Sequence, residues 1–293
     1  MRTISEVLMK QYGEKVYKLS LSSGCTCPNR DGKAGYGGCA FCSEGGSGEF
    51  ASSAKDIEVQ MEEAKARIRK KTDARKFIAY FQSFTNTYGD VKRLGDFYER
   101  VICRPEVVIL SIGTRPDCLG EDVMRMLVRL NEIKPVWVEL GLQTIHDKSA
   151  DRMNRGYHLP VFCEAVRKLK AVGIQVIVHV IFGLPGETKP MMMQTVHYLA
   201  EMDPMIDGVK IQMLNILKGS RLAQEYSRHP FSMLTLEEYT DLVCESLRIL
   251  PDGMAIHRMT GDGPRDLLIA PDWVRNKKKV LNTIARKQRT DRR

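Results

Sequence analysis

Long apolar runs are absent from this sequence. No segment of its 293 residues approaches the roughly 18 uninterrupted apolar residues that a membrane-spanning helix needs, so we expect no membrane partner. The first turns carry Glu6 and Lys10 and contain no apolar stretch of the kind that forms a secretory signal. Linkers rich in glycine, serine or proline and low-complexity segments are also missing. These absences favour a folded cytoplasmic protein.

An evenly spaced cysteine framework is absent as well. Of the eight cysteines, four fall within residues 25–42, and the others are scattered at Cys103, Cys118, Cys163 and Cys244. Small secreted domains that are held together by disulfides do not show this distribution. The cysteine usage therefore fits the reducing cytoplasm.

A uniform excess of one charge is missing too. The net charge is +9, but residues 275–293 alone contain nine of the 45 Lys and Arg residues and one of the 36 acidic residues. The rest of the chain, with 36 basic and 35 acidic side chains, is nearly neutral. A basic tail of this kind either contacts nucleic-acid phosphates or keeps the protein soluble, and the charge pattern leaves both possibilities open.

What the sequence does contain is a dense cysteine motif: Cys25-Thr-Cys27, a glycine-rich bend, and then Cys39-Ala-Phe-Cys42. The C-x2-C pair alone would fit a redox pair, and four thiolates would fit a structural zinc ion. A redox pair leaves Cys27 and the bend unexplained, and the upstream C-x-C is tighter than the usual zinc knuckle. Three thiolates on a flexible loop suit an iron–sulfur cluster in which one iron lacks a protein ligand. The spacing favours this cluster over zinc.

Apolar runs alternate with helical segments along the chain. The runs predict strands at residues 15–21, 77–81, 107–112, 136–142, 174–182 and 208–214. Helical periodicity predicts helices at residues 57–70, 91–101, 121–133, 159–171 and 191–202. Strands that are apolar on both faces indicate an α/β fold with a parallel sheet covered by helices. We divide the chain into a peripheral segment (1–14), this α/β unit (15–216) with its cysteine loop (25–50), and a C-terminal extension (217–293).

The extension has its own pattern. A capping box that begins at Thr235 predicts a helix to about residue 249, residues 254–260 predict a short strand, and residues 277–286 predict a helix with cations on one face. A dense polar cluster lies in the turn between the last two elements. We expect this cluster to bind substrate because such density on a non-helical segment is typical of binding sites; it comprises Arg258, Asp262, Arg265 and Asp266.

Six strand–helix units form either an open Rossmann-type sheet or a partial barrel. No G-x-G-x-x-G motif follows the first strand, where the cysteine loop stands instead. In barrels the active site lies at the carboxyl ends of the strands. Several polar segments directly follow strands and would meet at one mouth: the cysteine loop, Gln82, Thr114, Arg115, Gln143 and residues 183–187. This convergence predicts a partial, TIM-like (β/α)6 barrel.

Two polar positions interrupt the apolar strands. Glu139 lies four residues before Gln143, so both should point to the same side of their strand and contact a ligand. A carboxylate in an apolar strand is costly unless it is paired, and the expected partner is Arg115 or Arg155. His179 interrupts another apolar strand, where a satisfied core histidine is the commoner outcome.

Together these motifs resemble the radical S-adenosylmethionine (SAM) enzymes. The loop C-P-N-R-D-G-x5-G-C-x-F-C is similar to that of a branch related to the radical domain of the Elongator catalytic subunit, which includes YhcC/YtqA-type proteins and MnmL-type tRNA wobble-uridine enzymes. The resemblance extends from residue 19 to about residue 284. It rests further on Thr114-Arg-Pro-Asp117, Glu139-Leu-Gly-Leu-Gln-Thr144, Asn154-Arg-Gly156, Phe182-Gly-Leu-Pro-Gly-Glu187 and His257-Arg-Met-Thr-Gly-Asp-Gly-Pro-Arg-Asp266.

The resemblance implies a radical SAM partial barrel and its cofactors. Cys27, Cys39 and Cys42 would hold a [4Fe–4S] cluster whose fourth iron binds SAM, while Cys25 is a spare thiol. The reduced cluster would cleave SAM to a 5′-deoxyadenosyl radical that removes a hydrogen atom from the substrate. Gln82 stands where many relatives carry a glycine-glycine-glutamate motif, and we expect it to accept a hydrogen bond from the SAM amino group. The other expected cofactor contacts are Phe41, Thr114, Arg115, Glu139, Gln143 and Arg155.

The resemblance also implies a substrate. Relatives in this branch modify the tRNA wobble uridine and convert its 5-carboxymethylaminomethyl group to 5-aminomethyl. We expect tRNA as a partner, the basic tail as a phosphate contact, and a donor such as flavodoxin or ferredoxin as the source of electrons. The sequence leaves open a small-molecule or protein substrate for the radical enzyme. It also leaves open a zinc-stabilised nucleic-acid-binding protein without enzymatic activity.

Overall fold

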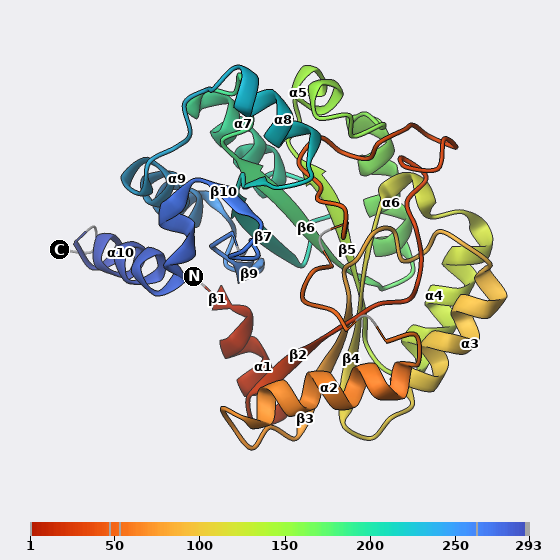
Figure 1. Ribbon diagram of the computed structural model, residues 1–293. Coiled ribbons are helices and arrows are strands. Elements are labelled where there is room, and N and C mark those ends of the chain that lie inside the picture. Colours follow the sequence, from red (N-terminus) through yellow and green to blue (C-terminus); the bar gives the residue numbers. More distant parts are fainter. Residues whose placement is uncertain (1, 47, 53, 262, 291–293) are drawn as a thin grey trace.

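The computed structural model describes residues 2–46, 48–52, 54–261 and 263–290. Its main sheet has eight parallel strands in the order β1-β9-β7-β6-β5-β4-β3-β2, and it curls into a half-barrel with the helices on its outer side (Figure 1). The partial barrel predicted from the sequence is therefore confirmed. The strands of this sheet are β1 (Arg2–Thr3), β2 (Val16–Leu21), β3 (Lys76–Phe81), β4 (Val107–Thr114), β5 (Val136–Gln143), β6 (Gln175–Phe182), β7 (Gly208–Met213) and β9 (Ala255–Arg258).

The helices follow the strands in the order that the periodicity predicted. Among the described residues, none of these helices combines the length and apolar character that crossing a membrane requires. A separate antiparallel pair joins β8 (Ile216–Leu217) to β10 (Leu268–Ala270). The α-helices are α1 (Ile4–Tyr12), α2 (Ile57–Arg69), α3 (Val91–Ile102), α4 (Glu121–Ile133), α5 (Asp147–Arg152), α6 (Leu159–Ala171), α7 (Lys189–Ala200), α8 (Arg221–Arg228), α9 (Leu236–Ile249) and α10 (Lys277–Thr290).

Each barrel strand sends alternate side chains to two different environments, as the two-residue period of a strand requires. On β3, Phe77, Ala79 and Phe81 pack into the core between the sheet and the helices. The residues between them, Ile78 and Tyr80, face the concave side and join a smaller cluster there. The concave side thus has its own packing, separate from the large outer core.

The lower part of the concave side is apolar and is closed by the N-terminal helix. Ile78, Ile109, Trp137 and Ile177 form the small inner cluster, and Leu8 of α1 packs against them. The same N-terminal segment supplies β1, which pairs in parallel with β9 at one edge of the sheet. The sequence predicted only a peripheral segment at 1–14. Residues 2–12 instead extend the sheet through β1 and close the lower end of its concave side through α1.

The C-terminal extension packs on the outside of the β7 and β9 edge. The capping box of α9 is present, because the Thr235 hydroxyl accepts from the backbone N–H of Glu238 and the Glu238 carboxylate accepts from the backbone N–H of Thr235. Val280, Thr283 and Ile284 form the buried face of α10, which lies against α9. The predicted basic tail is thus a packed helix as far as Thr290, and residues 291–293 lie outside the described part of the chain.

Candidate active site

A cavity of about 230 Å³ lies on the concave side of the sheet, at the carboxyl ends of the parallel strands. The loop after β2 supplies one wall, and the ends of the other barrel strands supply the rest. The structure brings most of the predicted site residues together here: Cys27, Cys39, Phe41, Cys42, Gln82, Thr114, Arg115, Glu139, Gln143 and Arg258 all line the cavity.

The other predicted site residues lie elsewhere. Arg155 is buried behind the cavity wall, with 1 % of its surface exposed. Arg265 and Asp266 are exposed on the turn that follows β9 and do not line the cavity. Asp262 lies outside the described residues. A substrate role for Arg265, Asp266 and Asp262 stays a prediction from the sequence.

The cysteine loop is a compact structure built around Asn29. The backbone carbonyl of Pro28 accepts hydrogen bonds from Ala34 and Gly35, and the backbone N–H of Gly38 donates to the carbonyl of Asn29 over 2.7 Å. The buried Asn29 amide donates to the carbonyl of Asn154 over 2.5 Å. These bonds fold the glycine-rich bend back on itself and place Cys39 at the cavity.

The motif Asn154-Arg-Gly156, which follows α5, holds this loop in place by hydrogen bonds. The Asn154 amide donates to the carbonyls of Gly38, over 2.8 Å, and Tyr36, over 3.1 Å. Arg155 donates to the carbonyls of Leu142 and Thr144, so it fixes the turn that follows β5. Arg155 therefore holds the backbone that carries the site, rather than pointing into it.

Arg115, which directly follows β4, adds a further hydrogen bond to the segment that contains Arg155. Its guanidinium forms a bidentate pair with Asp117, at 2.9 and 2.6 Å, and donates to the carbonyl of Arg155 over 2.7 Å. The guanidinium carbons of Arg115 and Arg155 both lie over the ring of Tyr157, at 4.8 and 4.7 Å from its centroid. Two arginine charges are thereby held close to the cysteine loop.

The cysteines fall into two environments. Cys25 is buried in the outer core, where desolvation raises the pKa of its thiol, and it does not line the cavity. Cys39 and Cys42 are joined by a tight turn in which the Cys42 N–H donates to the Cys39 carbonyl over 3.0 Å. A hydrogen bond from Cys42 and the charge of Arg115 lower the pKa of Cys39 to about 7 despite burial. A thiol of this kind ionises readily and can serve as a metal ligand.

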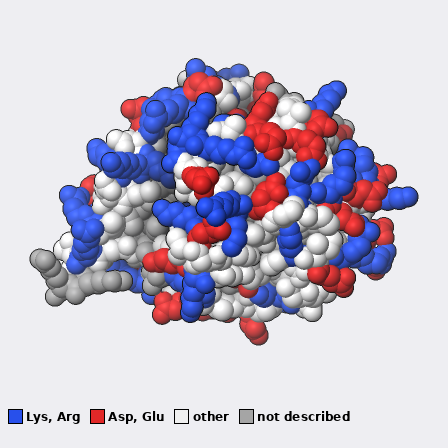
Figure 2. Space-filling model, turned by 90° about the horizontal axis from the view of Figure 1, so that it is seen from below, with Lys and Arg blue, Asp and Glu red and all other residues white. Residues whose placement is uncertain are grey.

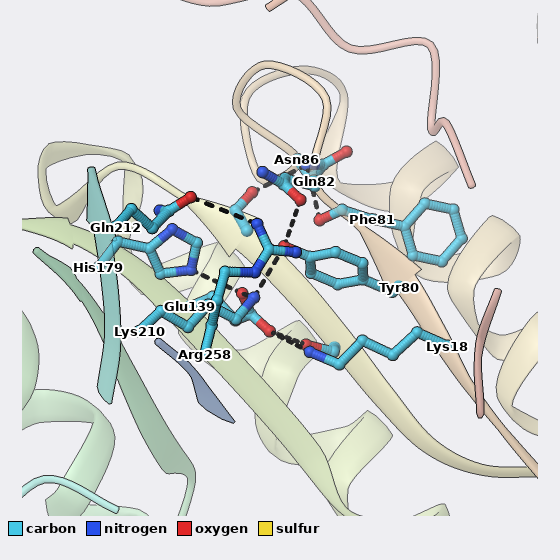
Figure 3. A network of polar contacts seen from close by, with 12 residues as sticks. Lys18, Tyr80, Phe81, Gln82, Asn86, Glu139, His179, Lys210, Gln212 and Arg258 are labelled. Carbon is cyan, nitrogen blue, oxygen red and sulfur yellow. Dashed lines mark hydrogen bonds and ion pairs between the residues drawn. The ribbon is translucent and has the colours of Figure 1, made fainter. Parts of the chain in front are cut away.

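Beneath the loop lies a buried ionic network centred on Glu139 (Figure 3). Ser111 donates to Oε1 of the carboxylate over 2.8 Å, and Lys18 lies 3.5 Å from the same oxygen. His179 Nε2 is 2.7 Å from Oε2, and the Lys210 ammonium contacts this oxygen directly. Both carboxylate oxygens are thus shared among four groups from β2, β4, β6 and β7.

The prediction that Arg115 or Arg155 pairs with Glu139 was wrong. Neither Arg115 nor Arg155 reaches the carboxylate, because both serve the loop scaffold, and the pairing cations are Lys210 and Lys18. Burial alone would raise the pKa of Glu139, but the charges of Lys210 and Lys18 hold it well below its usual range. Glu139 is therefore ionised inside the barrel. The sequence offered one sign of Lys210, a charged side chain in the mostly apolar strand β7.

His179 is more than a satisfied core residue, because it both pairs with Glu139 and lines the cavity. Burial and the charge of Lys210 lower the pKa of His179 to about 4. The ring is neutral at physiological pH, and it donates its Nε2–H to the carboxylate. Its Nδ1 is then a hydrogen-bond acceptor.

Gln82 is oriented by the same network. Lys210 donates to the Tyr80 hydroxyl over 2.9 Å, and this hydroxyl donates to the Gln82 carbonyl oxygen over 2.5 Å. This bond uses one of the two lone pairs of the Gln82 oxygen, so the predicted acceptance from the SAM amino group stays a prediction. The Gln82 amide also offers N–H groups, which suit a carboxylate or hydroxyl oxygen.

Hydrogen-bond acceptors for a cofactor come from other parts of the wall. Among the described residues, three cavity-lining side chains have a buried oxygen without a hydrogen-bond partner: Thr85, Gln143 and Asn215. Gln143 also has a φ of 60°, a strained conformation for a residue other than glycine that is often found at functional sites. Unpartnered buried oxygens fit a ligand rich in N–H and O–H donors, such as the amino group and ribose of SAM.

Three thiols of the loop fit a [4Fe–4S] cluster, which takes each thiolate on a different iron. Cys27, Cys39 and Cys42 all line one cavity, and the Cys39 thiol has a lowered pKa. Cys27, Cys39 and Cys42 would hold the cluster. When bound, it and SAM supply a 5′-deoxyadenosyl radical.

Comparison with known proteins shows the family. Residues 23–199 match the Radical SAM superfamily and residues 206–289 match the Radical_SAM C-terminal domain. The chain is 44 % identical to the Bacillus subtilis protein YtqA, over 96 % of this chain and 87 % of that protein. It is 35 % identical to Escherichia coli YhcC, over 92 % of this chain and 86 % of that protein. The chain belongs to the radical SAM superfamily.

Its position within that superfamily follows from these matches. The chain is a radical SAM enzyme of the YtqA/YhcC group, and the family implies a [4Fe–4S] cluster and SAM as cofactors. The tRNA uridine(34) acetyltransferase of Methanocaldococcus jannaschii is a more distant relative, 27 % identical over 55 % of this chain and 30 % of that protein. A solved structure of Methanocaldococcus infernus Elp3 shares the fold, with a TM-score of 0.67, 20 % identity, and coverage of 78 % of this chain and 58 % of that one.

Replacing each cysteine of the loop by alanine tests the ligand set. We expect Cys27→Ala, Cys39→Ala and Cys42→Ala to lose most of the iron and acid-labile sulfide after anaerobic reconstitution, because each removes one thiolate. Cys25→Ala is the matched control and should retain both, because its thiol lies in the outer core. Full iron in Cys39→Ala, or loss of iron in Cys25→Ala with the fold intact, would contradict the assignment.

Proposed function

We propose that this enzyme modifies the wobble uridine of tRNA by converting its 5-carboxymethylaminomethyl group to 5-aminomethyl. One electron from a donor such as flavodoxin or ferredoxin starts the reaction. The carbon next to the carboxylate loses a hydrogen atom to the deoxyadenosyl group. The same carbon then loses one electron, which replaces the electron that the donor supplied at the start. Addition of water to the resulting C=N bond breaks the C–N bond. Substrate, SAM and water thus give the amine, glyoxylate, methionine and 5′-deoxyadenosine, so atoms and electrons balance.

Exposed aromatic side chains on the cysteine loop, residues 25–50, are the observation that carries the RNA substrate. Tyr36, at the tip of the cysteine loop, is 79 % exposed, and Phe50 is 51 % exposed and lines the cavity. Tyr36 lies so close over Gly32 that a Cβ atom there would be 2.6 Å from the ring. An aromatic ring that is held on a glycine and still open to solvent is a suitable platform for an unstacked base.

Cations of the cysteine loop lie over two other aromatic rings, those of Phe84 and Tyr88. On the same loop, the Arg30 guanidinium lies 5.1 Å from the centroid of the Phe84 ring, and the Lys33 ammonium lies 5.7 Å from that of Tyr88. Stacking platforms next to positive charge are typical of proteins that bind single-stranded nucleic acid, because the charge follows the phosphates while the rings hold the bases. The anticodon loop of tRNA offers such unstacked bases.

The tail contributes less free charge than its composition implies. Lys287 pairs with Glu237 and Asp241 of α9, both at 2.6 Å, and Arg286 lies 3.8 Å from Glu237. Lys278 and Lys279, in the first turn of α10, are nevertheless exposed. Positive side chains are also seen at the left of Figure 2. The two lysines are suited to contact phosphates of the tRNA body.

The relatives support the same class of substrate. A protein that is named for uridine 34 of tRNA shares 27 % identity with 55 % of this chain. That name describes the relative, and it favours RNA over a small-molecule or protein substrate for this chain. The membership in the radical SAM superfamily favours an enzyme over a zinc-stabilised binding protein.

Nucleoside analysis of tRNA tests the proposed conversion. A strain that lacks the gene should accumulate 5-carboxymethylaminomethyluridine and lose 5-aminomethyluridine and its methylated derivative when digested tRNA is examined by mass spectrometry. The wild-type gene should restore the profile, whereas a gene encoding Cys39→Ala should not. An unchanged profile in the deletion strain would contradict the proposed substrate.

The salt dependence of tRNA binding tests the role of α10. Each phosphate contact that is lost should reduce the slope of log K against log salt concentration by about 0.7–0.9. We expect Lys278→Gln/Lys279→Gln to weaken tRNA binding. The slope should fall by the amount that corresponds to about one or two lost phosphate contacts, as measured by fluorescence anisotropy. The matched control, Lys70→Gln/Lys71→Gln, removes the same charge beyond the end of α2 and should leave the slope unchanged. Equal slopes for both variants would place the phosphate contacts elsewhere.

A further inference from the structure

Three polar side chains on neighbouring strands form one wall of the cavity. His179 on β6, Gln212 on β7 and Arg258 on β9 all line it (Figure 3). The register places His179 beside Lys210, and Lys210 beside Arg258. Across the concave side, the Lys210 ammonium that lies beside these side chains also reaches the Tyr80 hydroxyl of β3, which bonds to Gln82.

Hydrogen bonds fix the polarity of each group on this wall. The Gln212 carbonyl oxygen accepts from Arg258 over 3.3 Å, so the other end of the amide offers N–H donors. His179 donates its Nε2–H to Glu139, so its Nδ1 is an acceptor. The wall thus combines a guanidinium and amide donors with a single imidazole acceptor.

The charge of the surroundings favours an anion. The acid of this wall, Glu139, has both carboxylate oxygens occupied by Ser111, His179, Lys18 and Lys210. Burial and then the charges of Lys210 and Arg258 lower the pKa of His179, so its ring is neutral beside this wall. Among the described residues of the wall, an incoming carboxylate would meet the Arg258 guanidinium and the Gln212 amide, which are both suited to an anion.

We propose that this wall binds a carboxylate attached to a secondary amine, with Arg258 and Gln212 holding the carboxylate and His179 Nδ1 accepting the amine N–H. This assignment rests on the proposed function, in which the substrate carries an N-carboxymethyl group. The wall then distinguishes substrate from product, because the aminomethyl product lacks the carboxylate. Glu139, Lys210 and Lys18 act through His179 and the local field and are positioning residues.

Binding of two nucleosides tests the wall without turnover. The probes are 5-carboxymethylaminomethyluridine and 5-aminomethyluridine, titrated calorimetrically into the reconstituted, SAM-loaded protein without a reductant. We expect the wild type to prefer the carboxylate-bearing nucleoside at least tenfold, which is the effect of one charge-assisted hydrogen bond. Arg258→Met and Gln212→Glu should each reduce this preference to about twofold or less. Arg167→Met is the matched control and should retain it, because Arg167 is exposed on the outer helix α6 and does not line the cavity.

The outcomes separate this inference from the proposed function. Equal affinity of the wild type for both nucleosides, or an undiminished preference in Gln212→Glu, overturns the inference whether or not RNA binds. Gln212→Glu nearly conserves shape, so it decides the matter even where Arg258→Met fails to fold. An anticodon stem-loop that contains the carboxylate-bearing nucleoside is titrated in parallel. Failure of the stem-loop to bind, with the nucleoside preference intact, contradicts the tRNA substrate and leaves the carboxylate subsite standing.

Discussion

One buried carboxylate, Glu139, balances the charge inside the half-barrel. Its side chain has no exposed surface, and it accepts hydrogen bonds or ion pairs from strands on both sides of β5. A buried Lys210 without this partner would be an uncompensated charge, a situation that costs about 3–5 kcal/mol in buried ion pairs. The same contacts make His179 Nδ1 an acceptor and, through the Tyr80 hydroxyl, fix the orientation of the Gln82 amide. The hydrogen-bond polarity of the cavity floor thus follows from the position of one carboxylate.

A second constraint holds the cysteine loop over this floor. The loop has almost no regular secondary structure, so its shape depends on side chains that satisfy its backbone. Asn29 and Asn154 exchange hydrogen bonds with the backbone of each other's segment, and Arg155 fixes the turn after β5. The cysteines and the floor are therefore positioned by one connected network. In this network, motifs at widely separated places in the sequence are tied together at the carboxyl ends of neighbouring strands.

The sequence predicted the architecture well because the fold depends on local periodicity. Alternation of apolar runs and helical segments located six barrel strands within about two residues. The cysteine loop, Gln82, Thr114, Arg115 and Gln143 did meet at one cavity, whereas residues 183–187 do not line it. Partners across the barrel were not predictable in this way. Lys18 and Lys210 are separated from Glu139 by 121 and 71 residues, so only the curl of the sheet shows that they meet. The sequence analysis missed β1 and the contact of Leu8 with the inner cluster. A strand of two residues and one short helix are too short to show a clear hydrophobic periodicity.

Reductive cleavage of SAM by the wild type and by Glu139→Gln tests the central role of this carboxylate most directly. Each protein is reconstituted anaerobically, its iron and sulfide are measured, and 5′-deoxyadenosine is quantified by chromatography after reduction with dithionite. The account predicts deoxyadenosine from the wild type. It also predicts at least a tenfold loss in Glu139→Gln at equal iron content, because Lys210 loses its counter-charge and Gln82 and His179 lose their orientation. Wild-type protein with an intact cluster and no deoxyadenosine, or a Glu139→Gln protein as active as the wild type, would contradict it.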